Sequence, residues 1–404
     1  MPALRRNRDF VLLQAGELLS SAGTAVTALA YPLVVLAASG SPARAGLVTF
    51  ARLAPFGVLG LFAGVAADRW DRRALMVGAD AVRALALTTL ATALAAGGAR
   101  FGHILAVAVV EGSGATVFRA ARAGALRAVV PRSQLPAAVG VEEARESAVR
   151  IGGPPLGGAL FGLGAAVPFA ADAVSYLASG AAVLTMRARF QEPRAAERTP
   201  LRTRIAEGIR LLWGHPLLRA CALIYGGGNV LIPGILLALV VVARGAGLSG
   251  PQTGVLLALF GTGTLVGSLV SPLFRRHLSV RAIMLLELWT WLAPWVFVAW
   301  PDVHVLAASL VPLAVAAPVT DSVVVGYRVA MTPDRLLGRV ESVRSAIALS
   351  LAPLGPLAAG LMLEALSARA TVAVFATLGV ALAVAATSSR SLREAPSLDE
   401  LAAV

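Results

Sequence analysis

The chain has 404 residues, of which 57% are hydrophobic and only 14% are charged, and its formal net charge is +13. Soluble globular domains are about 45–50% apolar and about 25% charged, so this composition excludes an ordinary soluble protein, and it also excludes a disordered one. A spanning helix needs about 20 apolar residues. The length therefore accommodates about a dozen spans and leaves no room for a separate soluble catalytic domain.

Long, mostly apolar stretches recur along the whole chain. We expect each to be a helix, because backbone polar groups inside lipid must be satisfied within the segment. The predicted spans are 10–37, 46–67, 74–96, 101–126, 136–163, 166–187, 217–243, 251–273, 280–299, 303–327, 337–363 and 368–389.

The chain contains an internal repeat. Gly355 lies 202 positions after Gly153, and the same offset relates four further pairs: Pro131 and Pro333, Leu135 and Leu337, Pro154 and Pro356, and Gly158 and Gly360. Parallel repeats of this kind build one large class of secondary transporters. The predicted fold is an all-α membrane protein with twelve transmembrane helices in two pseudo-symmetric six-helix halves, residues 1–190 and 216–404.

A polar, arginine-rich stretch, residues 191–215, forms the predicted cytoplasmic linker between the halves. Leu201, Ile205, Ile209 and Leu212 follow helical spacing within it. This pattern predicts an amphipathic helix on the inner membrane surface; an ordinary solvated loop helix is the alternative.

Basic residues set the predicted orientation. The chain has no lysine, and its arginines concentrate in alternate loops, in the linker and near both termini. The positive-inside rule then places both termini in the cytoplasm. An isoelectric point near 11.4 is typical of nucleic-acid binding, but positive charge dispersed between apolar segments indicates cytoplasmic loops instead and no nucleic-acid partner.

The stretch after the second span reads Gly64-Val-Ala-Ala-Asp68-Arg69-Trp70-Asp71-Arg72-Arg73. It resembles the loop signature G-x-x-x-D-R-x-G-R-R of the major facilitator superfamily, except that Asp71 replaces the usual glycine and weakens the case for a tight turn. By residue chemistry alone, Gly64 would let another helix approach closely. Asp68 could face a helix N-terminus or an arginine, and the arginines would hold the loop inside.

The fifth span contains Gly153-Pro154-Pro155-Leu156-Gly157-Gly158. Proline bends a helix and glycines permit close packing at the bend. The motif resembles the G-P-x-x-G-G motif of superfamily antiporters that export drugs and metabolites; simple helix packing is the alternative reading.

The resemblance covers residues 10–389 and points to the bacterial exporter branch that includes the enterobactin exporter. It implies a monomeric, multi-pass protein of the bacterial inner membrane with a small-molecule substrate, protons as coupling ions and no cofactor. Ala108 departs from the arginine that such exporters often carry there, which removes the usual proton-relay residue.

Ionisable residues inside membrane spans are functional candidates by default. The fourth and fifth spans should form a hairpin near Pro131, which places Arg122 level with Glu142, Arg119 level with Glu143 and Glu146, and Glu111 level with Arg150. Glu111 lies about 15 Å deep at 1.5 Å per residue. We therefore expect Glu111, beside Arg150, to be the first proton-coupling candidate, Glu17 the second and Glu287 the third. Asp172 is expected to make a packing or loop contact nearer the outer face.

The second half carries Asp321 and Arg344, which the offset of 202 matches to Arg119 and Glu142 with reversed charge. This reversal predicts a cytoplasmic gate in which Arg119 pairs with Asp321 and Glu142 pairs with Arg344. The alternative is static neutralisation within each half.

Candidates to line a mostly apolar substrate cleft are Tyr31, Phe118, Asn229 and Trp289, although aromatic residues in spans often face lipid. The predicted function is secondary active export of a drug-like or secondary-metabolite molecule by proton antiport. An importer or uniporter on the same fold and a non-transporting receptor remain alternatives. The single cysteine, the scattered histidines and the missing Walker sequence speak against a metal site, an enzyme and ATP drive.

Overall fold

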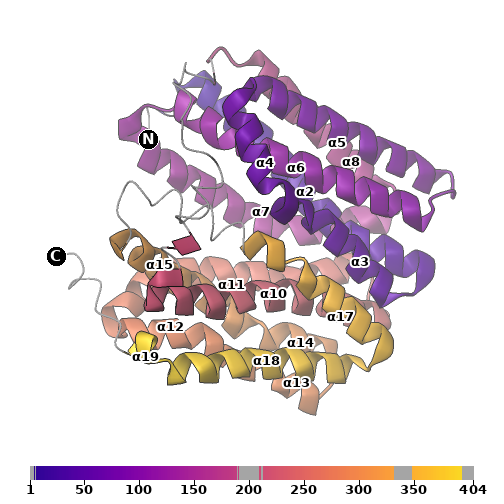
Figure 1. Cartoon of the computed structure of the whole chain (residues 1–404). Helices are drawn as coiled ribbons and strands as arrows, with labels where there is room; N and C mark the ends of the chain where they lie inside the picture. The colour runs from indigo at the N-terminus through magenta and orange to yellow at the C-terminus, as the bar shows by residue number, and fades with distance from the viewer. Residues whose placement is uncertain are drawn as a thin grey trace. The chain divides into compact units, whose positions relative to one another are not determined.

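The computed structural model describes residues 4, 6–188, 190, 209–210, 213–331 and 348–393, and every regular element within them is helical (Figure 1). The chain divides into two compact units. The first comprises Met1–Ala195 and Ala243–Ala258, and the second comprises Ala196–Val242 and Leu259–Val404. The linker helix expected within 191–215 lies almost entirely outside the described residues.

Helix α2 is central to the first unit. It packs along α8 and α7, while α5 packs against both α6 and α8, and α6 packs against α3, α4 and α5. The bounds of these helices are α2 (Arg8–Ser39), α3 (Pro42–Leu53), α4 (Pro55–Arg69), α5 (Arg72–Ala95), α6 (Phe101–Val129), α7 (Leu135–Leu163) and α8 (Val167–Thr185), with a 3-10 turn at Arg132–Gln134.

Local sequence signals explain where these helices begin and end. The Asn7 side chain caps the start of α2 by accepting a hydrogen bond from the Phe10 amide at 3.1 Å, as Asn commonly does. Gly40 ends α2 with a φ of +63°, a conformation that glycine adopts without a steric penalty. Pro55 begins α4, so the single span predicted at 46–67 consists of two helices, α3 and α4.

The second unit contains shorter pieces. Its predicted span at 280–299 is interrupted by the 3-10 turn η2, and α12 packs against α15 and α18. The helices are α12 (Val280–Trp289), η2 (Thr290–Leu292), α13 (Trp295–Ala299), α14 (Val303–Ser309), α15 (Val311–Met331), α17 (Leu354–Ala365), α18 (Ala368–Ser388) and α19 (Arg390–Arg393). Helices α10 (Pro216–Gly245) and α11 (Gly250–His277) contribute to both units.

The described residues include ten helices long and apolar enough to cross a membrane, or eleven if the bent pair Pro42–Gly60 and Phe62–Arg69, which covers α3 and α4, forms one span. The expected count of twelve is thus not confirmed. Helix α7 is not among the ten. Its first half carries the charged residues Glu142, Glu143, Arg145, Glu146 and Arg150.

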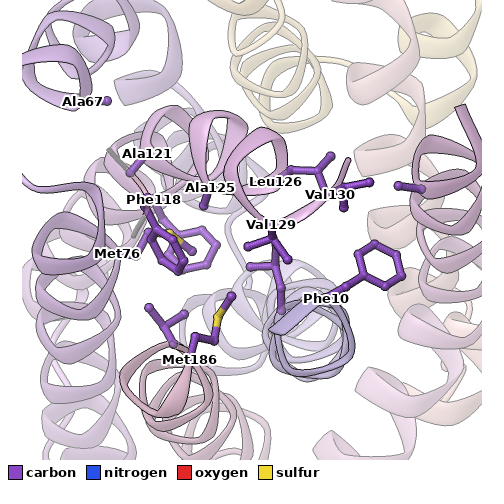
Figure 2. Packing of buried hydrophobic residues seen from close by; sticks show 14 of the residues in the cluster. Phe10, Ala67, Met76, Phe118, Ala121, Ala125, Leu126, Val129, Val130 and Met186 are labelled. Atoms are coloured by element: carbon purple, nitrogen blue, oxygen red, sulfur yellow. The ribbon is translucent and has the colours of Figure 1, made fainter. Parts of the chain in front are cut away.

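One hydrophobic core of the first unit joins α2, α5, α6 and the end of α8 (Figure 2). Phe10, Met76, Phe118 and Met186 are buried in it. Phe118, expected to line a substrate cleft, is therefore a core residue, because its face of α6 points into this cluster.

Candidate functional site

Charged side chains inside the first unit gather into two clusters. The first, named the Glu111 cluster, contains Arg52, Asp80, Arg83, Glu111 and Asp172, with Thr24, Thr27 and Tyr176. The second, named the Glu17 cluster, contains Glu17, Arg122, Glu142 and Arg145. Buried charges are tolerated when they are paired and hydrogen-bonded.

Glu111 accepts three hydrogen bonds in the first cluster. Arg52 binds it through two nitrogens, with Nε 2.7 Å from one carboxylate oxygen and Nη2 3.1 Å from the other. The Tyr176 hydroxyl donates a third hydrogen bond at 3.1 Å. The side chain of Glu111 is 1% exposed and that of Arg52 is 12% exposed. This forked geometry is the strong form of an arginine–carboxylate pair.

Arg83 joins the remaining members of the cluster. Its guanidinium lies 3.6 Å from the centroid of the Tyr176 ring and hydrogen-bonds the hydroxyl of the same residue. It also lies 3.3 Å from Asp80 and 3.9 Å from Glu111, and it donates to the Thr24 hydroxyl at 3.1 Å. Arg83 thus connects α2, α5, α6 and α8 at one point.

Asp172 is fully buried in α8. The Thr27 hydroxyl of α2 lies 2.8 Å from one carboxylate oxygen, and the Ser175 hydroxyl lies 2.9 Å from the other. A Cβ at Gly23 would collide with the Asp172 carboxylate, so the glycine lets this side chain reach α2. Asp172 was expected to make a packing or loop contact, and it instead joins two helices through a buried carboxylate.

The predicted pairing of Glu111 with Arg150 is wrong. Arg150 is exposed, and Glu111 is paired with Arg52 of α3. The expectation that residues equidistant from the turn near Pro131 lie side by side is met close to that turn, where Arg122 contacts Glu142. It fails deeper because α6 packs chiefly on α3, α4 and α5, whereas α7 packs chiefly on α2.

In the Glu17 cluster, the carboxylate of Glu17 pairs with both Arg122 and Arg145. Arg145 also donates to the Gln14 side-chain oxygen at 2.8 Å. Glu142 is paired with Arg122 within the first unit, which is what static neutralisation requires. Arg145 also lies 3.9 Å from the exposed Glu146, so the arginines of this cluster do not outnumber the acids around them.

Other gate residues are placed as follows. The Arg119 guanidinium lies 4.4 Å from the centroid of the Phe56 ring, a cation–π contact. Asp321 is an exposed residue of α15 in the second unit. Arg344 lies outside the described residues, and both predicted gate pairs stay predictions.

In the motif that begins at Gly64, Arg72 and Arg73 both donate hydrogen bonds to backbone carbonyl groups. Arg72 donates to the carbonyls of Ala67 and Phe190 at 3.0 and 3.1 Å, and Arg73 donates to those of Met186 and Ala188 at 2.7 and 2.8 Å. The chain that leaves α8 is thereby fastened to the start of α5.

The acids of this motif have different tasks. Asp68 lies 3.5 Å from Arg72, which agrees with the expected arginine partner. Asp71, the departure from the superfamily pattern, caps α5 by accepting from the Ala74 amide at 2.7 Å. Arg69 is exposed, and no described residue would approach a Cβ at Gly64, so the expected close helix contact at Gly64 is not found within the described part of the chain.

The glycines of α7 are packed as expected for close helix contact. A Cβ at Gly153 would collide with Ala25, and one at Gly157 would press on the backbone of Val26, both in α2. A Cβ at Gly158 would collide with the backbone of Gly250 at the start of α11. Pro154 lies inside the same helix, and its carbonyl occupies the space beside Gly254 of α11.

The remaining cleft candidates differ in exposure. Tyr31 is fully buried against the Phe169 ring, 5.0 Å away. In the second unit, Asn229 is exposed and donates to the Tyr225 carbonyl at 3.1 Å. Trp289 is 37% exposed and donates to the Thr387 hydroxyl at 3.2 Å.

Glu287 is the buried acid of the second unit. Its side chain is packed among the core residues of α12, and among the described residues its oxygen Oε2 has no hydrogen-bond partner. The nearby Thr320 hydroxyl donates to the Ile283 carbonyl at 3.1 Å and also contacts the Glu287 carboxyl group. Glu287 is thus a different case from Glu111 and Glu17, which arginines neutralise.

Sequence reasoning missed Arg52, Arg83 and Arg145. All three lie within predicted spans, so the rule that intramembrane charges are functional candidates applies to them. They were missed because the arginines were assigned to loops when the orientation of the chain was predicted. No group of His, Cys, Asp and Glu suited to a metal ion occurs among the described residues.

Comparison with known proteins gives consistent results. Residues 3–403 match the transmembrane secretion effector family. The multidrug efflux pump Tap of Mycolicibacterium fortuitum is 27% identical over 95% of this chain and 96% of its own length.

Two solved structures show the same fold. A variant of the nucleoside transporter NupG has a TM-score of 0.75 at 12% identity, over 95% of this chain and all of that one (100%). A D-xylose–proton symporter has a TM-score of 0.71 at 13% identity, over 94% and 96% of the two chains.

The family match spans nearly the whole sequence, and the family and its relatives are transporters rather than enzymes. The apolar helices and the structural likenesses agree with that result. The chain belongs to the transmembrane secretion effector family of the major facilitator superfamily and is a multi-pass membrane transporter.

Proposed function

We propose that the protein exports a drug-like or secondary-metabolite small molecule across the bacterial cell membrane in exchange for protons. The observation that carries this proposal is the similarity to Tap, an efflux pump, over almost the full length of both chains. The exporter-type glycine and proline motif in α7 supports the same direction of transport. We further propose a monomer with both termini in the cytoplasm, which works by alternating access of its two halves.

The coupling site that we propose in the first half is the Glu111 cluster. Its five charged residues lie on α3, α5, α6 and α8, and all are nearly or fully buried. Ionisable groups at such places are retained for function more often than for stability. Glu17 and Glu287 are secondary candidates, of which Glu287 is favoured by its unpartnered oxygen.

The test uses everted membrane vesicles that contain the full-length protein, with ethidium and a panel of antibiotics as probes. An exporter accumulates its substrate in such vesicles when their interior is acidified, and a protonophore abolishes the accumulation. A parallel susceptibility panel in an efflux-deficient host should show raised resistance to the same compounds.

A second candidate function is proton-coupled uptake, because a symporter shares the fold. If the protein catalyses uptake, intact cells should accumulate the probe when the external medium is acidic, and everted vesicles should not. A receptor would bind a ligand and show no flux in either preparation. Either result would overturn the export proposal.

A further inference from the structure

The Glu111 cluster has an uneven charge count. It holds two arginines, Arg52 and Arg83, and three acids, Asp80, Glu111 and Asp172. Arginine remains charged in proteins, so full ionisation would leave one net negative charge among side chains that are almost completely buried. The neighbouring Glu17 cluster cannot compensate, since its two arginines already face at least as many acids.

An uncompensated charge inside a membrane protein is expensive. A buried carboxylate without a counter-charge escapes this cost by binding a proton. One of the three acids must therefore be protonated for the cluster to be neutral.

The ion pairs identify the acid that holds the proton. Glu111 is bound through two nitrogens by Arg52, and Asp80 pairs with Arg83 at 3.3 Å. Asp172 forms no ion pair with any described residue, and its two oxygens contact the neutral hydroxyls of Thr27 and Ser175. We propose that Asp172 is the proton-carrying group of the Glu111 cluster, an inference that rests on the proposed proton antiport.

Asp80 is the rival, because one of its oxygens lacks a hydrogen-bond partner. A proton on Asp80 would leave Asp172 as a fully buried anion without an ion pair, which is the costly arrangement. A proton on Asp172 leaves every remaining charge paired. The pairing geometry therefore favours Asp172.

The hydrogen bonds around Asp172 suit both of its charge states. The Thr27 hydroxyl lies 3.2 Å from each of the carbonyls of Gly23 and Thr24, so it can donate there and accept the carboxyl proton. When the proton leaves, the same hydroxyl can donate to the carboxylate at 2.8 Å. Ser175 has the same choice, with the Asp172 carbonyl 2.8 Å away.

Loss of the proton would change the charge of the whole cluster by one unit without breaking an ion pair. The ionisable groups that would respond lie on the surrounding helices: Tyr31 on α2, Arg52 on α3, Asp80 and Arg83 on α5, Glu111 on α6 and Tyr176 on α8. Because Arg83 and Tyr176 join four of these helices, a charge change at Asp172 acts directly on their packing.

The test compares Asp172→Asn with Thr27→Val, each in the full-length protein reconstituted in lipid vesicles. Thr27→Val leaves the charge count unchanged and removes a hydroxyl that contacts Asp172, whereas Asp80 contacts Arg83. Infrared spectra over a pH series report the carbonyl band of a protonated carboxyl group. We expect a band that titrates in the unmodified protein, shifts in frequency in Thr27→Val and is lost in Asp172→Asn. A band that keeps its frequency in Thr27→Val would overturn the assignment.

Asparagine mimics the neutral carboxyl, so Asp172→Asn should fold. Misfolding of Asp172→Asn beside a folded Thr27→Val would count against the proposal. In the same vesicles, ethidium counterflow should persist in Asp172→Asn while its response to a pH gradient disappears.

The two levels of inference fail differently. If the unmodified protein moves ethidium without any response to a pH gradient, proton antiport is wrong. If its transport does respond, and Asp172→Asn responds equally, antiport stands and the role of Asp172 is wrong.

Discussion

At the scale of single residues, Arg52 is held by three hydrogen bonds, whereas the Nε atoms of Arg83 and Arg145 have no hydrogen-bond partner among the described residues. Arg52, besides its two contacts with Glu111, donates to the Thr24 carbonyl at 2.9 Å. Such saturation matters in lipid, where water cannot replace a missing acceptor. Replacing one partner of a buried ion pair therefore lowers the stability of the protein more than replacing both.

Glu111→Gln should lower the stability of the protein by about 3–5 kcal/mol, because it leaves the Arg52 guanidinium without its carboxylate. The double variant Arg52→Gln with Glu111→Gln should recover much of that loss. Thermal unfolding in detergent, followed by the recovery of monodisperse protein, measures both. Strictly additive losses would show that the two side chains are not energetically coupled.

Asp71→Ala should reduce the free energy of unfolding by about 0.5–2 kcal/mol, since it removes the N-cap of α5. Asp71→Gly should reduce it by only a few tenths of a kcal/mol. The same unfolding measurement in detergent distinguishes them. An Asp71→Ala variant as stable as the unmodified protein would mean that the hydrogen bond from the Ala74 amide contributes nothing.

At the scale of helices, sequence reasoning located most elements because spans are long and apolar. It did not foresee the break between α3 and α4, although Pro55 marks it, since proline inside a span is common in membrane helices. It placed Glu111 and Arg150 side by side because hairpin partners were assumed to be neighbours. The order in which helices surround α2 depends on close packing at sites such as Gly23 and Gly157, which no single hairpin reveals.

The contact between α7 and α11 gives the prediction at this scale. Gly158→Val should disrupt it and reduce both the stability and the transport rate, because a side chain there meets the backbone of Gly250. Gly152→Val, on the same helix, is the control, since a Cβ at Gly152 meets nothing within 4 Å. Measured efflux of ethidium from cells should fall only in the first variant. Similar efflux from both would refute a role for close packing at Gly158.

At the scale of the whole molecule, the reversed charges of the two halves predict a gate. In a Cys221→Ala background, Arg119→Cys with Asp321→Cys should form a disulfide that depends on pH and on added substrate. The measurement is the shift in electrophoretic mobility after oxidation. Cross-linking that ignores both conditions would exclude a moving contact. Glu142→Cys with Asp321→Cys is the mismatched control, because the 202-residue offset does not pair these positions.

The arginine pair that follows α4 has a practical consequence for protein engineering. Three hydrogen bonds from Arg72 and Arg73 to the carbonyls of Met186, Ala188 and Phe190 fasten the end of the first half to the start of α5. A cut or an inserted tag before Phe190 would strip acceptors from these guanidinium groups, whereas one placed after it would leave all of them intact. A split transporter, expressed as two polypeptides that reassemble in the membrane, should therefore be divided beyond Phe190.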